Sequence, residues 1–136
     1  MKALRHRTAG GNRFYIDSGS VLWGFGSNDY GQLGNGQRDE LGVFYSEPIR
    51  IASDVVSVDM SMNGYFCIYL TSDGKLYGMG ADIDHILGED SDPEGSPEVM
   101  IGQETFPAVT SPVLIEENVA YARTGGKCIV YLKNDG

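Results

Sequence analysis

The feature that most constrains this chain is an internal repeat. A shift of 54 residues pairs Gly10 with Gly64, Tyr15 with Tyr69, Ile16 with Leu70, Leu22 with Leu76, Trp23 with Tyr77, Gly24 with Gly78, Gly26 with Gly80, and Leu33-Gly34 with Leu87-Gly88. A shift of 62 then pairs Gly64 with Gly126, Tyr69 with Tyr131, Leu70 with Leu132, and Asp73-Gly74 with Asp135-Gly136. The copies span about 9–62, 63–124 and an incomplete 125–136. Residues 1–136 are therefore expected to form one fragment of a repeat fold.

Each copy carries a pattern of short strands and tight turns. Residues 65–70 are aromatic and β-branched and run through an Asp-Gly turn into residues 75–80, as in a β-hairpin. A similar pair occupies 12–17 and 21–25, and further strands are expected at 48–52, 55–60, 112–115, 119–123 and 128–132. A period near fifty residues with about four strands per unit is typical of a propeller blade. We predict an all-β fold, a partial β-propeller built of four-stranded antiparallel blades.

Alternation along the strands predicts which side chains lie between blades. Phe66, Ile68 and Leu70 share one face of their strand, and Cys128, Val130 and Leu132 occupy the matching positions. The opposite face carries Tyr15, Tyr69 and Tyr131 in register, which we interpret as aromatic filler between neighbouring blades. The register places Cys67 and Cys128 on opposite faces of different blades, so no disulfide between them is expected.

Three segments resemble a known repeat family. VLWGFGSNDYGQLGNG at 21–36 resembles the signature of the regulator of chromosome condensation repeat family, in which a W-G-x-N-x-x-G-Q-L-G-like stretch closes each unit. GYFCIYLTSDG at 64–74 and GKCIVYLKNDG at 126–136 resemble its second hallmark, a glycine and an apolar strand ending in L-T-x-D-G. The second copy has ADIDHILG where the family has a glycine and a glutamine, which indicates a divergent, bacterial-type member. The repeat-signature positions are Gly24, Gly26, Gly31, Gln32, Leu33, Gly34, Gly64, Asp73, Gly74, Gly78, Gly80, Leu87, Gly88, Asp135 and Gly136.

The resemblance implies a closed seven-bladed ring, which needs more blades than these residues supply. Two arrangements would complete it. In the first, the remaining blades belong to the same longer chain, of which this sequence is an excerpt, and the stop at Asn134-Asp135-Gly136 favours that interpretation. Alternatively, several copies assemble by homo-oligomerisation. In either case the open blades would expose strand edges and apolar faces.

Charge is distributed unevenly along the chain. The net charge is −9, the first thirteen residues are basic, and ten acidic residues but no lysine or arginine lie between Leu76 and Ala122. Such a surface repels phosphate, so direct nucleic-acid binding is not expected. An acidic surface of this kind would favour a basic partner or a cation, or would only keep the protein soluble. No run of eighteen apolar residues exists and the basic start lacks an apolar segment, so neither membrane insertion nor a secretory signal is expected, and a complete chain would be cytoplasmic.

No catalytic arrangement stands out, and we expect no enzyme. The two histidines lie in the basic N-terminal segment (His6) and beside acidic residues (His85), and both cysteines fall at strand positions expected to be buried. The Gly24-Phe25-Gly26 motif, which recurs as Gly78-Met79-Gly80, lacks a following helix and a P-loop lysine, so it indicates backbone geometry and not a phosphate site. No cofactor is expected.

Two loops are candidate binding sites. Residues 35–47 contain the apolar pair Phe44 and Tyr45 within a polar loop, a composition expected of a small hot spot unless both side chains pack back onto the blade. Residues 89–111 form the second variable insertion. The loop from 81 to 95 offers oxygen ligands of the kind calcium takes, without the EF-hand spacing. Its candidate ligands are Asp82, Asp84, Glu89, Asp90, Asp92 and Glu94.

The function most consistent with these features is a non-catalytic protein-interaction scaffold, because propellers present loops at the ends of a rigid ring. The family resemblance implies one alternative, a guanine-nucleotide exchange factor for a small GTPase, by analogy of fold alone. A further alternative is a secreted or surface adhesion or carbohydrate-binding module. The partner protein itself is not identified by the sequence.

Overall fold

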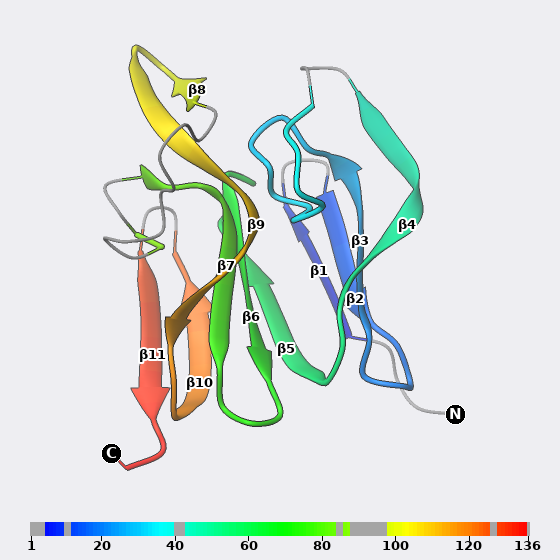
Figure 1. The fold of residues 1–136 in the computed structure, drawn as a ribbon, viewed down its shortest axis with the longest axis vertical. Coiled ribbons are helices and arrows are strands. Elements are labelled where there is room, and N and C mark those ends of the chain that lie inside the picture. The colour runs from blue at the N-terminus through cyan, green and yellow to red at the C-terminus, as the bar shows by residue number, and fades with distance from the viewer. Residues whose placement is uncertain are drawn as a thin grey trace.

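The computed structural model describes residues 5–9, 12–39, 43–83, 86–87, 98–125 and 128–135. Within these ranges the regular elements are β-strands, and every strand pair is antiparallel. The strands form successive sheets that stand side by side in chain order (Figure 1). The predicted all-β, partial-propeller fold is confirmed.

The sheets correspond to two blades and the start of a third. The first blade has the strand order β1 (Arg5–Ala9), β2 (Asn12–Ile16), β3 (Leu22–Ser27) and β4 (Phe44–Ala52). The second has the order β5 (Val55–Met60), β6 (Phe66–Thr71), β7 (Leu76–Ala81), β9 (Glu104–Glu116) and β8 (Glu98–Ile101). The third consists of β10 (Val119–Thr124) and β11 (Ile129–Lys133). Each sheet begins one strand before a sequence copy does.

Two strands were not expected from the sequence. β1 lies in the basic N-terminal segment and pairs with β2, so the backbone of His6 is opposite Tyr15. β8 pairs with the first half of β9 and gives the second blade a fifth strand, in a region interpreted as a loop. Between them Gly102 adopts a left-handed φ of 66°, which allows a tight turn. Neither strand has an apolar alternation of its own. β1 pairs with β2, and β8 pairs with β9 and buries Val99 in a cluster with Ala81 and Ala108.

The hairpin between β2 and β3 is fixed by Asp17. Its Oδ1 accepts hydrogen bonds from the backbone N–H groups of Gly19 (2.8 Å) and Val21 (3.0 Å), and its Oδ2 accepts one from the indole N–H of Trp23 (2.9 Å). The bonds from Val21 and Trp23 hold the pKa of Asp17 below its ordinary value. In the second blade Thr71 replaces Asp17, and its hydroxyl oxygen accepts the N–H of Lys75 at 3.2 Å.

Apolar side chains fill the space between consecutive blades, as the alternation predicted. The cluster between the first and second blades contains Phe14, Ile16, Leu22 and Leu33 from one side and Val55, Val58, Met60, Cys67, Tyr69 and Met79 from the other. The cluster between the second and third contains Phe66, Ile68, Leu70, Leu76, Leu87 and Val109, with Val119 and Ala122 facing them. The face formed by Phe66, Ile68 and Leu70 is therefore the one that the next blade covers.

Backbone hydrogen bonds join the blades at the end where the hairpin turns lie, here called the turn end. At each junction, the carbonyl of a turn residue in one blade accepts the N–H of the first residue of the next blade. The carbonyl of the residue just before that next blade accepts an N–H from the hairpin turn of the same next blade. The bonds are Val55 N to Ser20 O (2.9 Å), Val119 N to Gly74 O (2.8 Å), Ser72 N to Asp54 O (2.8 Å) and Asn134 N to Asn118 O (2.9 Å). The same connection thus occurs at both junctions.

The repeated Gly-x-Gly motif is a backbone requirement. Gly26 and Gly80 have φ values of 115° and 112°, and the ladder to the outer strand shifts register next to each of them. A Cβ on Gly80 would lie 2.5 Å from the carbonyl oxygen of Tyr65 and 2.7 Å from the Cα of Phe66. Glycine therefore permits a repeated β-bulge at these positions.

Candidate functional site

Asn28, at the end of β3, organises the loop that leads to β4. Its Oδ1 accepts the N–H of Leu33 at 3.0 Å. Its Nδ2 donates to Asn35 Oδ1 (3.0 Å), to the carbonyl oxygen of Gln37 (2.9 Å) and to Asp39 Oδ2 (2.9 Å). One amide therefore holds both halves of the loop at the end of the first blade opposite the turns, here called the loop end.

The two candidate aromatic residues of this loop have different environments. Tyr45 packs partly against the core, and its hydroxyl donates to Asp39 Oδ2 at 2.7 Å. The hydrogen bonds from Asn28 and Tyr45 keep the pKa of Asp39 below its ordinary value, so the carboxylate stays charged within the network. Phe44, the first residue of the edge strand β4, is 63% exposed. Tyr45 packs back onto the blade, whereas Phe44 is presented to solvent.

Gln32 of the repeat signature connects the first blade to the second. It is only 1% exposed. Its Nε2 lies 3.3 Å from Asn12 Oδ1, Ser27 Oγ and Asp29 Oδ1, and 3.4 Å from the carbonyl oxygen of Gly64 in the second blade. A buried amide with several acceptors satisfies groups that would otherwise be desolvated at a cost. This contact makes Gln32 part of the scaffold and not of a binding surface.

Asp82, the first candidate cation ligand, occupies the position equivalent to Asn28. Its Oδ1 accepts the N–H of Leu87 at 2.8 Å, just as Asn28 accepts that of Leu33, and the residue is buried. The other candidate ligands, Asp84, Glu89, Asp90, Asp92 and Glu94, lie outside the described residues, as does Gly88. Among the described residues no group of three or more His, Cys, Asp or Glu side chains is arranged to hold a metal.

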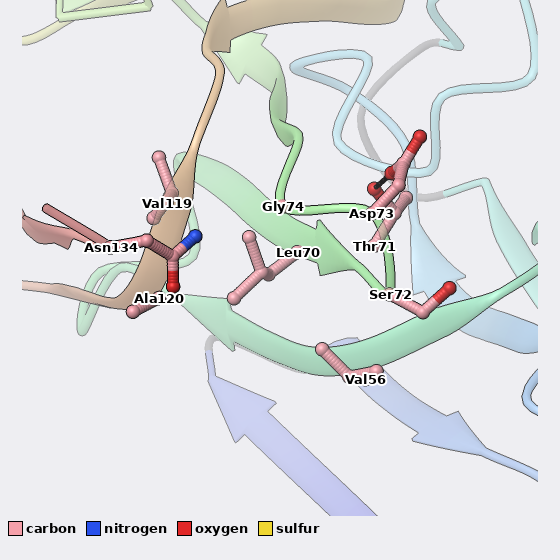
Figure 2. Close-up of a pocket in the computed structure, with 9 residues that line it drawn as sticks. All are labelled: Val56, Leu70, Thr71, Ser72, Asp73, Gly74, Val119, Ala120 and Asn134. Carbon is pink, nitrogen blue, oxygen red and sulfur yellow. Dashed lines mark hydrogen bonds between the residues drawn. The ribbon is translucent and has the colours of Figure 1, made fainter.

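A cavity of about 390 Å³ lies at the turn end between the second and third blades (Figure 2). Leu70 and Val119 are its buried apolar members, and Asp73 lies in the turn at its rim. The hydroxyl of Thr71 donates a hydrogen bond to Asp73, and this bond is the main reason that the pKa of the Asp73 carboxyl lies below its ordinary value. The remaining lining residues are Val56, Ser72, Gly74, Ala120 and Asn134. The cavity is thus lined by both apolar and polar residues, with the Asp73 carboxyl among them.

The two cysteines are both free and have opposite environments. Cys67 is fully buried, and burial, followed by the nearby charge of Asp59, raises the pKa of its thiol. Cys128 is exposed, contrary to the expectation that both were buried, because no blade covers its face within the described residues. A buried protonated thiol is a poor nucleophile. His85 lies outside the described residues.

Sequence reasoning found some of these groups and missed others. Phe44 and Tyr45 were identified together, although only Phe44 is exposed. Asn28 and Asp39, which give the loop its shape, were not identified. The sequence did contain a signal for Asn28. It directly follows a strand and lies five residues before Leu33, and Asp82 lies at the same distance before Leu87.

No helix in the described part of the chain is long and apolar enough to cross a membrane.

Residues 20–70 match the model of the Regulator of chromosome condensation (RCC1) repeat. The chain is similar to Prp20p from Saccharomyces cerevisiae in a study of its binding to Gsp1p and histones, with a TM-score of 0.76 and 21% identity over 97% of this chain and 31% of that one. It is also similar to human WBSCR16, with a TM-score of 0.73 and 19% identity over 97% of this chain and 31% of that one. A search among curated proteins gave no match.

A further similar chain comes from the structure of Kap60 bound to yeast RCC1 (Prp20), with a TM-score of 0.73 and 22% identity over 97% of this chain and 30% of that one. The present chain therefore spans about a third of the length of these proteins. The repeat match covers the Asn28 loop, Gln32 and the strand from Phe66 to Leu70. Residues 20–70 thus match a regulator of chromosome condensation repeat, and the chain has the fold of part of a β-propeller.

Proposed function

We propose that this chain acts as a non-catalytic protein-interaction module that binds its partner at the loop end of the first blade. The observation that carries the proposal is the exposure of Phe44 directly beside a loop held by Asn28, Asp39 and Tyr45. A large apolar side chain on a rigid support loses little conformational entropy on binding, which is typical of an interface hot spot.

The loop end suits recognition better than the turn end. At the turn end the carbonyls of Ser20, Asp54 and Gly74 already accept hydrogen bonds that join the blades. Those groups are committed to the scaffold. At the loop end Gln32 and the Gly36 N–H, which donates to the Thr110 carbonyl at 2.8 Å, also join the first blade to the second. Phe44 takes part in neither contact, so a substitution there leaves the blade junctions intact. Loops on rigid scaffolds commonly carry binding function.

The test begins by finding the partner. A photoreactive phenylalanine analogue at position 44, with the same analogue at Val56 on the turn end as the matched control, should capture a protein only from position 44. Phe44→Ala should then weaken binding of that purified protein by about tenfold to thirtyfold. Its urea midpoint should stay unchanged, because the side chain is mostly exposed. Equal capture from both positions, or an unchanged affinity, would refute the assignment.

The captured partner also separates the alternatives. The similar Prp20p structure is described with binding to Gsp1p and histones, which motivates a test for nucleotide exchange. A captured small GTPase that releases a fluorescent GDP analogue faster in the presence of this chain would favour an exchange factor over a simple scaffold. An envelope protein or a glycan would instead favour an adhesion module.

A further inference from the structure

The cavity at the turn end lies between two sheets that are joined within the chain. One wall is the hairpin turn of the second blade, residues 71–74, and the other belongs to the third sheet, which contributes Val119, Ala120 and Asn134 (Figure 2). The hydrogen bond from Val119 N to Gly74 O, at 2.8 Å, holds the two walls together. The junction between the first and second blades contains the equivalent bond, so the cavity is part of a repeated junction and not of an outer face.

The small side chain of Ala120 leaves space at this junction. Ala120 follows Val119 as Val56 follows Val55, and Val119 and Val55 each donate an N–H to the preceding turn. Ala120 therefore takes the position of Val56, without the γ-methyl groups of valine. The volume of about 390 Å³ lies within the range of small-molecule sites, about 300–1,000 Å³. The cavity is thus large enough for a small organic ligand.

The apolar part of the lining comes from both sheets. Leu70 and Val119 are buried, whereas Val56 and Ala120 are exposed. An aliphatic chain placed between the walls would remove this exposed apolar surface from water, which is favourable. The lining therefore suits a ligand whose body is hydrocarbon.

Asp73 is the one charged side chain among the residues that line the cavity in the described part of the chain. It is 62% exposed, and the hydrogen bond from Thr71 holds the pKa of its carboxyl below the ordinary value, so it is ionised at neutral pH. Lys75 Nζ lies 3.8 Å away on a side chain that is itself 41% exposed, and so open an ion pair is weak enough for another cation to replace it. A carboxylate in a lining without lysine or arginine favours a cation.

The carboxylate of Asp73 is placed differently from that of the first blade. Asp17 accepts three hydrogen bonds within the hairpin that it belongs to. At the matching position of the second blade Thr71 accepts the Lys75 N–H, and the carboxylate lies two residues further along the chain. The second blade thus presents at the surface a charge that the first blade uses inside its turn.

We propose that this cavity binds a small aliphatic amine in its protonated form, with the alkyl chain between the two sheets and the ammonium group beside the Asp73 carboxylate. The charge of the carboxylate disfavours an anionic ligand, and the net charge of −9 attracts cations to the whole chain. The site lies at the opposite end of the blades from Phe44, so it is independent of the protein partner proposed for the loop end.

An NMR titration with n-pentylamine, which is protonated at about pH 7, tests the proposal, with n-pentanol as the uncharged control. The backbone amide signals of Gly74, Val119 and Ala120 should shift together, with a Kd of about 1–10 mM for a ligand of so few atoms. The alcohol should bind about fivefold to tenfold more weakly, because it forms no charge-assisted hydrogen bond. Shifts spread over the whole chain, or equal affinities of the amine and the alcohol, would overturn the proposal.

Two variants separate the space from the charge. Ala120→Val fills the cavity, leaves the backbone bonds of the junction in place and suits a strand, and it should weaken amine binding about tenfold. Asp73→Asn keeps the shape and should weaken amine binding about fivefold while leaving the alcohol unaffected. Asp54→Asn is the matched control, because Asp54 is exposed at the same end but does not line the cavity. Binding that is unchanged in Ala120→Val, or reduced equally by the two Asp→Asn variants, would contradict the assignment.

A capped lysine, Nα-acetyl-lysine methylamide, tests whether the amine is a free molecule. It carries the same charge as n-pentylamine on a peptide-like body. It should bind more weakly, because its amide groups would lose water against the apolar lining. Equal or tighter binding of the capped lysine would assign the cavity to a lysine side chain of a partner protein, and the assignment to a free amine would be wrong.

Discussion

Leu33→Ala should loosen the junction between the first two blades. Leu33 is completely buried, and it shares its cluster with Phe14, Leu22 and Met79. The smaller side chain would leave a cavity between two hydrogen-bonded sheets, which relax little. Such substitutions cost about 2–5 kcal/mol, and we expect about 3 kcal/mol here. That is a large share of the roughly 5–15 kcal/mol that stabilises a typical domain.

Urea unfolding followed by fluorescence provides the assay, because Trp23 is the only tryptophan and lies in the first blade. With a slope of about 2 kcal/mol per molar urea, a loss of about 3 kcal/mol should lower the midpoint by about 1.5 M. Leu114→Ala, at a half-exposed position, should lower it by less than about 0.5 M.

A second variant tests whether the stability of each blade depends mainly on the blades next to it. Leu87→Ala removes the equivalent side chain from the junction between the second and third blades. If each blade interacts mainly with its neighbours, this variant should lower the circular-dichroism midpoint more than the Trp23 midpoint. The reasoning would be refuted if Leu33→Ala shifted the Trp23 midpoint no more than Leu114→Ala does.

Two further predictions concern titratable groups. In the native protein a thiol reagent should modify the exposed Cys128 rapidly and the buried Cys67 only after urea is added, and rapid modification of both would contradict the register of β6. Burial raises the pKa of Cys67 and of Tyr69 in the folded state, with additional contributions from Asp59 and Tyr77 respectively. Their neutral forms therefore stabilise the fold fully below the ordinary values of 9.0 and 10.0, and that stability is lost as the pH rises. The urea midpoint should fall between about pH 8 and about pH 11, and Tyr69→Phe should reduce the fall above about pH 10; a flat profile would contradict the burial of both groups.

The repeat in the sequence was sufficient to predict the blade core. Gly24 and Gly78, Leu33 and Leu87, and the alternation that ends at Leu70 all recur because each blade must meet its neighbour in the same way. Because each unit packs against its neighbour in the same way, the same residue types recur at the same spacing. This is why strands and facing residues could be predicted from one sequence.

The elements that depend on pairing and not on pattern could not be predicted. β1 and β8 are held by hydrogen bonds to a neighbouring strand, and β8 occurs only in the second blade, where no second copy signals it. The network around Asn28 joins residues up to eleven apart through polar groups, which leaves no periodic trace. A hydrophobic pattern reports repeated burial of apolar side chains. β8 buries a single apolar side chain, Val99, in a cluster with Ala81 and Ala108, and the network around Asn28 is polar, so neither produces such a pattern.

The same contrast indicates where function should be sought in this chain. Positions that repeat, such as Leu33 and Gly80, are explained by contacts within and between blades. Positions where the copies differ are free of that constraint, and Arg13 is the clearest case, since its equivalent Cys67 is fully buried. Arg13 can be charged because its side chain is exposed, and no blade within the described residues covers that side of β2. Phe44, the first residue of β4, likewise differs from its equivalent in the second blade, because Ala108 takes the same position in the ladder and is buried. Recognition in a repeat fold is therefore best sought at the residues that break the repeat.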